Sequence, residues 1–110
     1  MTYEEMKQQL DNYNWDDGFD FPEHILSNSN CDLALALEVF YLADGYAYLV
    51  DIEQNDCKPE KWLCFVKKLY ADIEKGVYTE SNHQFEIPLS KVQCYHLRKK
   101  NIPEVFLTSL

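Results

Sequence analysis

The segment DLALALEVFYLA, residues 32–43, decides the fold class because its apolar residues fall on every side of a helix. A surface helix carries one apolar stripe, whereas a helix that is apolar all round is buried. Asp44 and Gly45 follow the segment and end the helix, since both residue types favour turns. The segment therefore predicts a buried central helix around which the other elements pack.

A second apolar pattern predicts a long amphipathic helix with an apolar face. Asp56 can cap its start, Pro59 fits its first turn, and Gly76 supplies a C-terminal stop. Four lysines and an aspartate, Lys61, Lys67, Lys68, Asp72 and Lys75, lie off the apolar face. The apolar residues recur at helical spacing and are Trp62, Phe65, Val66, Leu69, Tyr70 and Ile73.

The rest of the chain also carries mostly helical patterns. The stretch from Tyr46 to Glu53 fits a helix or a strand, and we expect a helix. With 110 residues, the chain has the length of one domain. We predict an all-α fold, a single compact bundle of five to seven helices over residues 1–110. The further helices are expected over residues 2–13, from Pro22 to about Ser27 with Asp20 or Phe21 as a cap, from Ser90 through Leu97, and after Pro103.

The charge of the chain is unevenly placed. There are 19 Asp and Glu residues against 10 Lys and Arg residues, a net charge of −9. Residues 1–57 hold thirteen acids and one lysine, a charge of −12, whereas residues 58–110 hold six acids and nine bases, a charge of +3. An acidic surface can serve solubility alone. Complementary potentials also speed association, so we interpret the acidic half as a docking face for a basic partner.

The composition argues against several classes of function. A net charge of −9 disfavours nucleic acid binding, and no apolar run approaches the ~18 residues of a membrane span. The start, residues 1–5, is acidic and polar, unlike a targeting signal, so we expect a cytoplasmic protein. The four cysteines and three histidines lack the spacing of zinc ligands. We expect no metal, no cofactor and no catalytic activity.

Two acidic stretches of the sequence also contain aromatic residues. One is the glycine loop of residues 14–20 with the helix after it, and the other follows the central helix. Aromatic rings supply much of the energy of protein interfaces, and acids orient the partner; packing into the core is the other reading of these rings. The predicted partner-binding residues are Trp15, Asp16, Asp17, Asp20, Glu23, Asp44, Tyr46, Tyr48, Asp51, Glu53 and Asp56.

Residues 12–46 carry a motif. They contain the run Asn14-Trp15-Asp16-Asp17-Gly18, then Pro22, then the pair Cys31-Asp32 and Phe40. This pattern resembles a family of small, uncharacterised bacterial domains with the motif N-W-D-x-G…P…C-D…A-L…F. The resemblance implies a bacterial origin and, through the genomic context of the family, a role in toxin–immunity systems. In overall type the chain is similar to immunity proteins of contact-dependent growth inhibition.

These observations predict a bacterial immunity or antitoxin-type protein that neutralises a basic toxin domain, such as a nuclease. Its acids would mimic the anionic substrate of the toxin, and Trp15, Tyr46 or Tyr48 would anchor the contact. Two alternatives stay open. One is a regulatory or scaffold interaction domain without a toxin, and the other is a small metal-assisted hydrolase that uses Asp16, Asp17 and Asp20.

Overall fold

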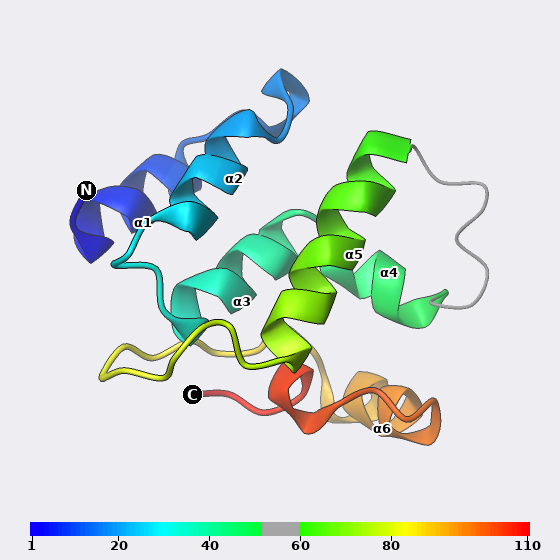
Figure 1. Ribbon diagram of the computed structural model, residues 1–110. Helices are drawn as coiled ribbons and strands as arrows, with labels where there is room; N and C mark the ends of the chain where they lie inside the picture. The colour runs from blue at the N-terminus through cyan, green and yellow to red at the C-terminus, as the bar shows by residue number, and fades with distance from the viewer. Residues whose placement is uncertain (52–59) are drawn as a thin grey trace.

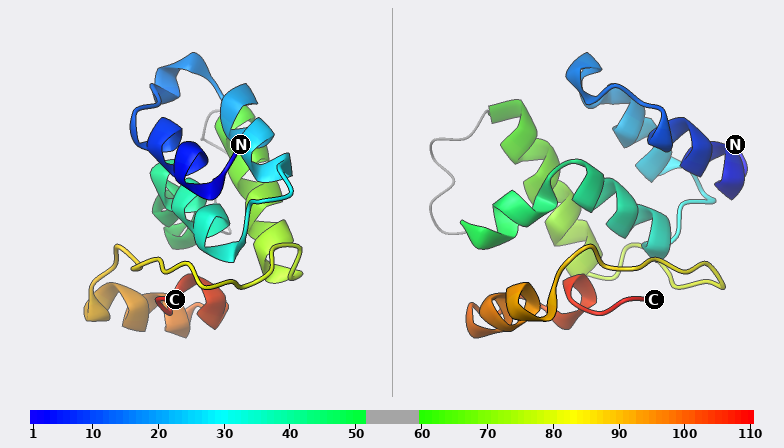
Figure 2. Two further views of the ribbon diagram at one scale, coloured as in Figure 1. Left: turned by 90° about the vertical axis from the view of Figure 1, so that its left-hand side faces the viewer. Right: turned by 180° about the vertical axis from the view of Figure 1, so that it is seen from behind.

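The computed structural model describes residues 1–51 and 60–110. In these residues the chain forms six α-helices, two short 3-10 helices and no strand, which confirms the all-α prediction (Figure 1). The views show α1 and α2 on one side of α3, and α6 with the C-terminal segment on the other, while α5 runs from the level of α2 to the C-terminal segment (Figure 2). The elements are α1 (Tyr3–Asp11), η1 (Trp15–Asp17), α2 (Asp20–Ser27), α3 (Leu33–Leu42), α4 (Gly45–Val50), α5 (Glu60–Glu74), α6 (Lys91–Lys99) and η3 (Glu104–Phe106).

Helix α3 lies at the centre of the core, as its apolar pattern predicts. It packs against α4 and α5, and the ring of Phe106 covers Phe40 with 5.1 Å between the ring centroids. Its Glu38 carboxylate forms an ion pair of 2.7 Å with Lys7 of α1. Thus α4, α5, α1 and the C-terminal segment all contact α3. Its buried residues are Leu33, Ala34, Leu35, Ala36, Leu37, Val39 and Phe40.

A tight turn joins α3 to α4. Asp44 adopts the left-handed conformation with φ of 63°, and Gly45 begins the next helix. The indole Nε1 of Trp62 donates to the Ala43 carbonyl at 2.7 Å, so α5 ties down this turn. Helix α4 confirms the helical reading of the stretch that begins at Tyr46, whereas Glu53 at its predicted end lies outside the described residues.

The start of α2 differs from the prediction. Asp20 is not a cap but the first residue of the helix, and Phe19 precedes it as an N-cap without a side-chain hydrogen bond. Gly18, with φ of 100°, turns the chain into this earlier start. Pro22 fits the third position because the amide it lacks would have no helical partner in the first turn. Asp20 and Glu23 therefore both lie in the first turn, where the helix dipole favours carboxylates.

The C-terminal end of α5 and the start of α6 follow the predicted signals. Gly76, with φ of 80°, ends α5, and the Val77 amide donates back to the Asp72 carbonyl at 3.0 Å. Residues 77–90 form no helix or strand, and Ser90 caps α6 through a capping box with Gln93. No helix in the described parts of the chain is long and apolar enough to cross a membrane.

We expect Gly45→Ala to lower the free energy of unfolding by about 1–3 kcal/mol. A Cβ atom at this position would lie 2.3 Å from the Phe40 ring and 2.6 Å from the Phe40 carbonyl oxygen, so α3 and α4 would have to move apart. Urea denaturation measures the change. Leu42→Ala is the control, because Leu42 is 41% exposed and its truncation should cost less than about 0.5 kcal/mol. An equal loss of unfolding free energy in the two variants would contradict the close approach of Gly45 to Phe40.

Candidate functional site

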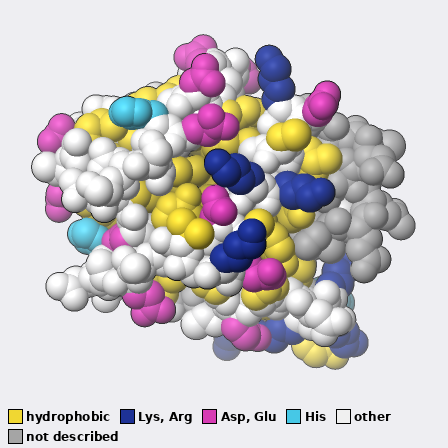
Figure 3. Space-filling view, viewed as in Figure 1, with side chains coloured by type: hydrophobic (Ala, Val, Ile, Leu, Met, Phe, Trp, Pro, Cys, Tyr) yellow, Lys and Arg dark blue, Asp and Glu magenta, His cyan; other side chains and the backbone are white. Residues whose placement is uncertain are grey.

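A groove of about 1050 Å³ runs between α2 and α5, on the face shown in Figure 3. Hydrophobic side chains gather in the middle of this face, and basic and acidic side chains surround them (Figure 3). Figure 1 shows α2 and α5 from the same side of the molecule as Figure 3. The groove is therefore a place where a second molecule could contact two helices at once.

One wall of the groove is acidic. Asp17 at the end of η1, and Asp20 and Glu23 in the first turn of α2, line it. All three side chains are exposed. The two α2 residues share a face because they are three positions apart, and the turn at Gly18 brings Asp17 beside them. Three of the predicted acids thus meet in one surface feature.

The opposite wall belongs to α5 and carries charges of both signs. Lys61, Cys64, Lys68 and Asp72 line it. Their spacing of three or four residues places them on one side of the helix. Both lysines are exposed. The groove is therefore not uniformly anionic, because two cations face the acidic wall.

The floor of the groove is apolar. The rings of Phe19 and Phe65 stack across it with 4.7 Å between centroids, which joins the start of α2 to α5. Phe65 and Leu69 are almost completely buried, and Phe19 and Leu26 are half-buried above them. An occupant of the groove would bury the apolar surface that these half-buried side chains still expose.

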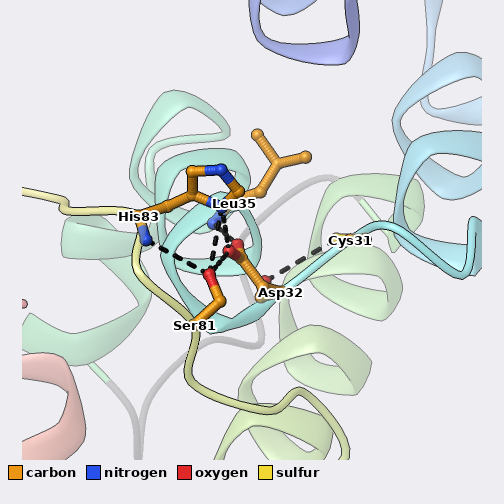
Figure 4. Close-up of polar contacts among 5 residues, drawn as sticks. All are labelled: Cys31, Asp32, Leu35, Ser81 and His83. Carbon is orange, nitrogen blue, oxygen red and sulfur yellow. Dashed lines mark hydrogen bonds and ion pairs between the residues drawn. The ribbon is translucent and has the colours of Figure 1, made fainter. Parts of the chain in front are cut away.

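Residues 77–83 are tied to the start of α3 by a polar cluster around Asp32 (Figure 4). Asp32 is 6% exposed and caps α3, since its Oδ1 accepts a hydrogen bond of 2.9 Å from the Leu35 amide. Its Oδ2 accepts from the Ser81 hydroxyl and lies 2.6 Å from Nδ1 of His83. The His83 ring stacks on Tyr3 of α1 at 3.5 Å. The cluster thus joins α1, α3 and this segment.

The cluster contains Ser, His and Asp but lacks the geometry of a catalytic triad. In a triad the imidazole contacts the acid through one nitrogen and the serine through the other. Here Ser81 Oγ lies 3.0 Å from the same Nδ1 of His83 that meets Asp32. Because the Ser81 hydroxyl donates to the carboxylate, the arrangement is a structural cross-link.

The hydrogen bonds of the cluster determine the ionisation of Asp32. Burial removes water from the carboxylate and by itself would raise its pKa, but hydrogen bonds from Ser81, Leu35 and His83 favour the charged form. The net effect lowers the pKa of Asp32 below its ordinary value of 3.8. The carboxylate is therefore charged at neutral pH.

This cross-link also positions Tyr78 at the groove. The carbonyl of Thr79, the next residue, accepts a hydrogen bond of 2.9 Å from the Leu33 amide, and Tyr78 lines the groove. Burial raises the pKa of Tyr78 to about 12. Burial, with the charge of Asp32, also raises the pKa of the nearby Cys31 thiol to about 12. Both groups are therefore neutral at pH 7, and the thiol is a poor nucleophile.

The structure separates the other predicted partner-binding residues from the groove. Asp16 is exposed but does not line it, and half-buried Trp15 packs beside Tyr13 and Phe19. Asp44 and Asp51, both exposed, flank α4.

Tyr48 requires a correction. It is 6% exposed and its ring packs 5.4 Å from that of Tyr70, so it belongs to the core rather than to a partner contact. The helical periodicity of α4 explains this, since Tyr48 points toward α5 while Tyr46 stays half-buried. Glu53 and Asp56 lie outside the described residues.

Several site residues were not predicted from the sequence. The helical spacing places Lys61, Lys68 and Asp72 off the apolar face of α5, but nothing in the local sequence shows that α2 lies opposite them. The pairing of Asp32 with Ser81 and His83 spans about fifty residues, and no spacing rule reveals it.

Within residues 1–51 and 60–110 no group of three or more His, Cys, Asp or Glu side chains is arranged to hold a metal ion. This includes Asp16, Asp17 and Asp20, the acids of the alternative hydrolase hypothesis. The described geometry therefore offers that hypothesis no support.

Residues 4–74, about two thirds of the chain, match the model of a family described as a domain of unknown function (DUF4274). The matched range contains α1 to α5 and hence both helical walls of the groove, whereas α6 lies beyond it. No curated protein and no solved structure matches the chain significantly.

We expect Asp32→Asn to lower the free energy of unfolding by about 1–3 kcal/mol at pH 7, since it weakens several buried hydrogen bonds to a charge. The folded pKa of Asp32 is lowered, so its contribution is complete above pH 3.8 and is lost as the pH falls through the folded pKa. Urea denaturation from pH 7 to pH 2.5 measures this, with the exposed Asp11→Asn as control. The two chains should converge in stability at low pH, and a constant difference would refute the assignment.

Proposed function

We propose that this chain, which belongs to the family described as a domain of unknown function (DUF4274), is a bacterial immunity or antitoxin-type protein. It acts in the cytoplasm by binding and neutralising a basic toxin domain, such as a nuclease, and it performs no catalysis. The observation that supports this proposal is the acidic wall of Asp17, Asp20 and Glu23 beside an apolar floor.

The acidic wall suits a basic partner for electrostatic reasons. The active site of a nuclease is basic because it binds phosphates, and a row of carboxylates presents a similar pattern of negative charge. Asp17, Asp20 and Glu23 are exposed and lie within one groove. The net charge of −9 adds a long-range attraction for a basic domain. Binding there would occlude the site that the toxin needs for its substrate.

The apolar floor of the groove can contribute binding energy that exposed charges do not provide. Exposed ion pairs each contribute little to affinity, whereas interface energy concentrates in apolar and aromatic contacts shielded from water. The half-buried Phe19, Leu26 and Tyr78 lie between the charged walls. An apolar centre with a charged rim is the usual organisation of a specific protein interface.

We expect the double variant Asp20→Lys/Glu23→Lys to bind a basic toxin domain taken from the neighbouring genes at least tenfold more weakly than the wild type. It reverses two of the three charges on the acidic wall, and close charge pairs at interfaces contribute about 1.5 kcal/mol or more. Surface plasmon resonance measures the affinity. Growth of cells that express the toxin together with each variant shows whether neutralisation is lost.

The matched control is Asp11→Lys/Glu86→Lys. Both double variants have the same net charge of −5, but Asp11 and Glu86 are exposed residues that do not line the groove. The control should retain wild-type affinity. If both variants lose affinity equally, the acidic wall is not the binding site. If the chain binds a protein but protects against no toxin, it is a regulatory or scaffold domain instead.

The association rate constant with the same toxin domain should fall steeply as salt increases. Exposed charges are screened within about 10 Å at 0.1 M ionic strength, so electrostatic steering weakens while short-range contacts persist. Stopped-flow mixing from 0.02 to 0.5 M NaCl gives the rate. A rate constant that does not change over this range would exclude steering by the acidic half.

A further inference from the structure

We infer that the groove receives an amphipathic α-helix of the partner, with basic residues along the edge that faces α2 and acidic residues along the edge that faces Lys61 and Lys68. This inference rests on the proposed function for the location of the site but not on the partner being a toxin. It differs from pure mimicry of an anionic substrate, because the partner segment must carry both signs of charge.

The first argument is that the opposite charges of the two walls do not neutralise each other. Among the described residues the ion pairs are Lys7–Glu38, His83–Asp32 and Arg98–Glu104, and none of them crosses the groove. Lys61 and Lys68 are exposed, as are Asp20 and Glu23. Each wall therefore presents charges that an inserted segment could pair with from both of its edges.

The second argument concerns the backbone of the occupant. An extended peptide commonly docks by adding a strand to an open sheet edge, and the lining of this groove comes from α2, α5 and the turns next to them. Helical walls have no row of free amides and carbonyls for a strand to pair with. A helix satisfies its own backbone hydrogen bonds, so it can enter such a groove without leaving polar groups unpaired.

The third argument comes from the spacing of the charges. Lys61 and Lys68 are seven residues apart, which separates them by about 10.5 Å along α5. Two acidic residues seven positions apart on a partner helix have the same separation. On α2, Asp20 and Glu23 are only three residues apart, and Asp17 extends this wall. The partner helix should therefore bear widely spaced acids on one edge and closely spaced bases on the other.

The fourth argument comes from the apolar floor. The half-buried side chains of Phe19 and Leu26 lie between the charged walls and still expose apolar surface. Helices that dock in grooves insert apolar side chains at positions i, i+3 or i+4 and i+7. Such a stripe between a basic and an acidic edge completes the complementary surface.

Three synthetic 21-residue peptides test this inference. All carry the same leucine stripe at helical spacing. The first has lysine on one edge and glutamate on the other, the second has lysine on both edges, and the third has glutamate on both. Fluorescence anisotropy measures their affinities for the full chain. We expect the first peptide to bind at least fivefold more tightly than either of the others.

Single substitutions on α5 give the matched comparison. Lys68→Glu should weaken binding of the first peptide about fivefold, the upper range for an exposed ion pair, and strengthen binding of the all-lysine peptide. Lys67→Glu causes the same change in net charge at an exposed position that does not line the groove. The ratio of the affinities of the first and the all-lysine peptide should therefore stay unchanged in this variant. Circular dichroism verifies that both variants fold.

The outcomes separate this inference from the proposed function. If the all-lysine peptide binds most tightly, or if no peptide binds, the two-signed helix is wrong. The proposed function would still stand if Asp20→Lys/Glu23→Lys abolished toxin binding. If the first peptide binds as expected while that variant leaves toxin binding intact, the groove takes a two-signed helix and the toxin binds elsewhere than at the acidic wall.

Discussion

Helix α3 is apolar on nearly every side, and the need to bury all of these sides shapes the rest of the structure. Leucine, alanine, valine and phenylalanine occupy its surface nearly all round, so folding must place other elements against every side of it. Helices α4 and α5 pack directly on it, α1 adds the Lys7–Glu38 ion pair, and Phe106 covers it from the C-terminal segment. The ten residues of one helix thus organise the whole chain.

The groove is a consequence of this arrangement. Helix α2 uses Pro22 and Ile25 to reach the core, and α5 uses Phe65, Val66, Leu69 and Ile73. Each helix therefore packs its apolar face against the core, and its polar flank stays at the surface. Where the two flanks face each other, an acidic wall meets a wall with two lysines. The Asp32 cross-link fixes Tyr78 at the same groove, so the core and the candidate site share one scaffold.

Local patterns predicted the elements well. The stripe of α5, the caps at Gly76 and Ser90, and the helical reading after Tyr46 all depend on neighbours within a few residues, and the structure has them. The start of α2 was misjudged because Pro22 is compatible with any position in the first turn, and only the turn at Gly18 selects among them. Tyr48 was misjudged because a tyrosine beside acids looks the same in sequence whether its ring is buried or exposed.

Residue type and spacing along the chain are enough to predict that the chain is helical, that α3 is buried, and that negative charge is concentrated in the first half. The packing of the helices, in contrast, sets Asp17, Asp20 and Glu23 opposite Lys61 and Lys68 across one groove and brings Asp32 to Ser81 and His83. The physical reason is that a charge acts on what lies near it in space, and the packing around α3 brings together residues that are dozens of positions apart in sequence.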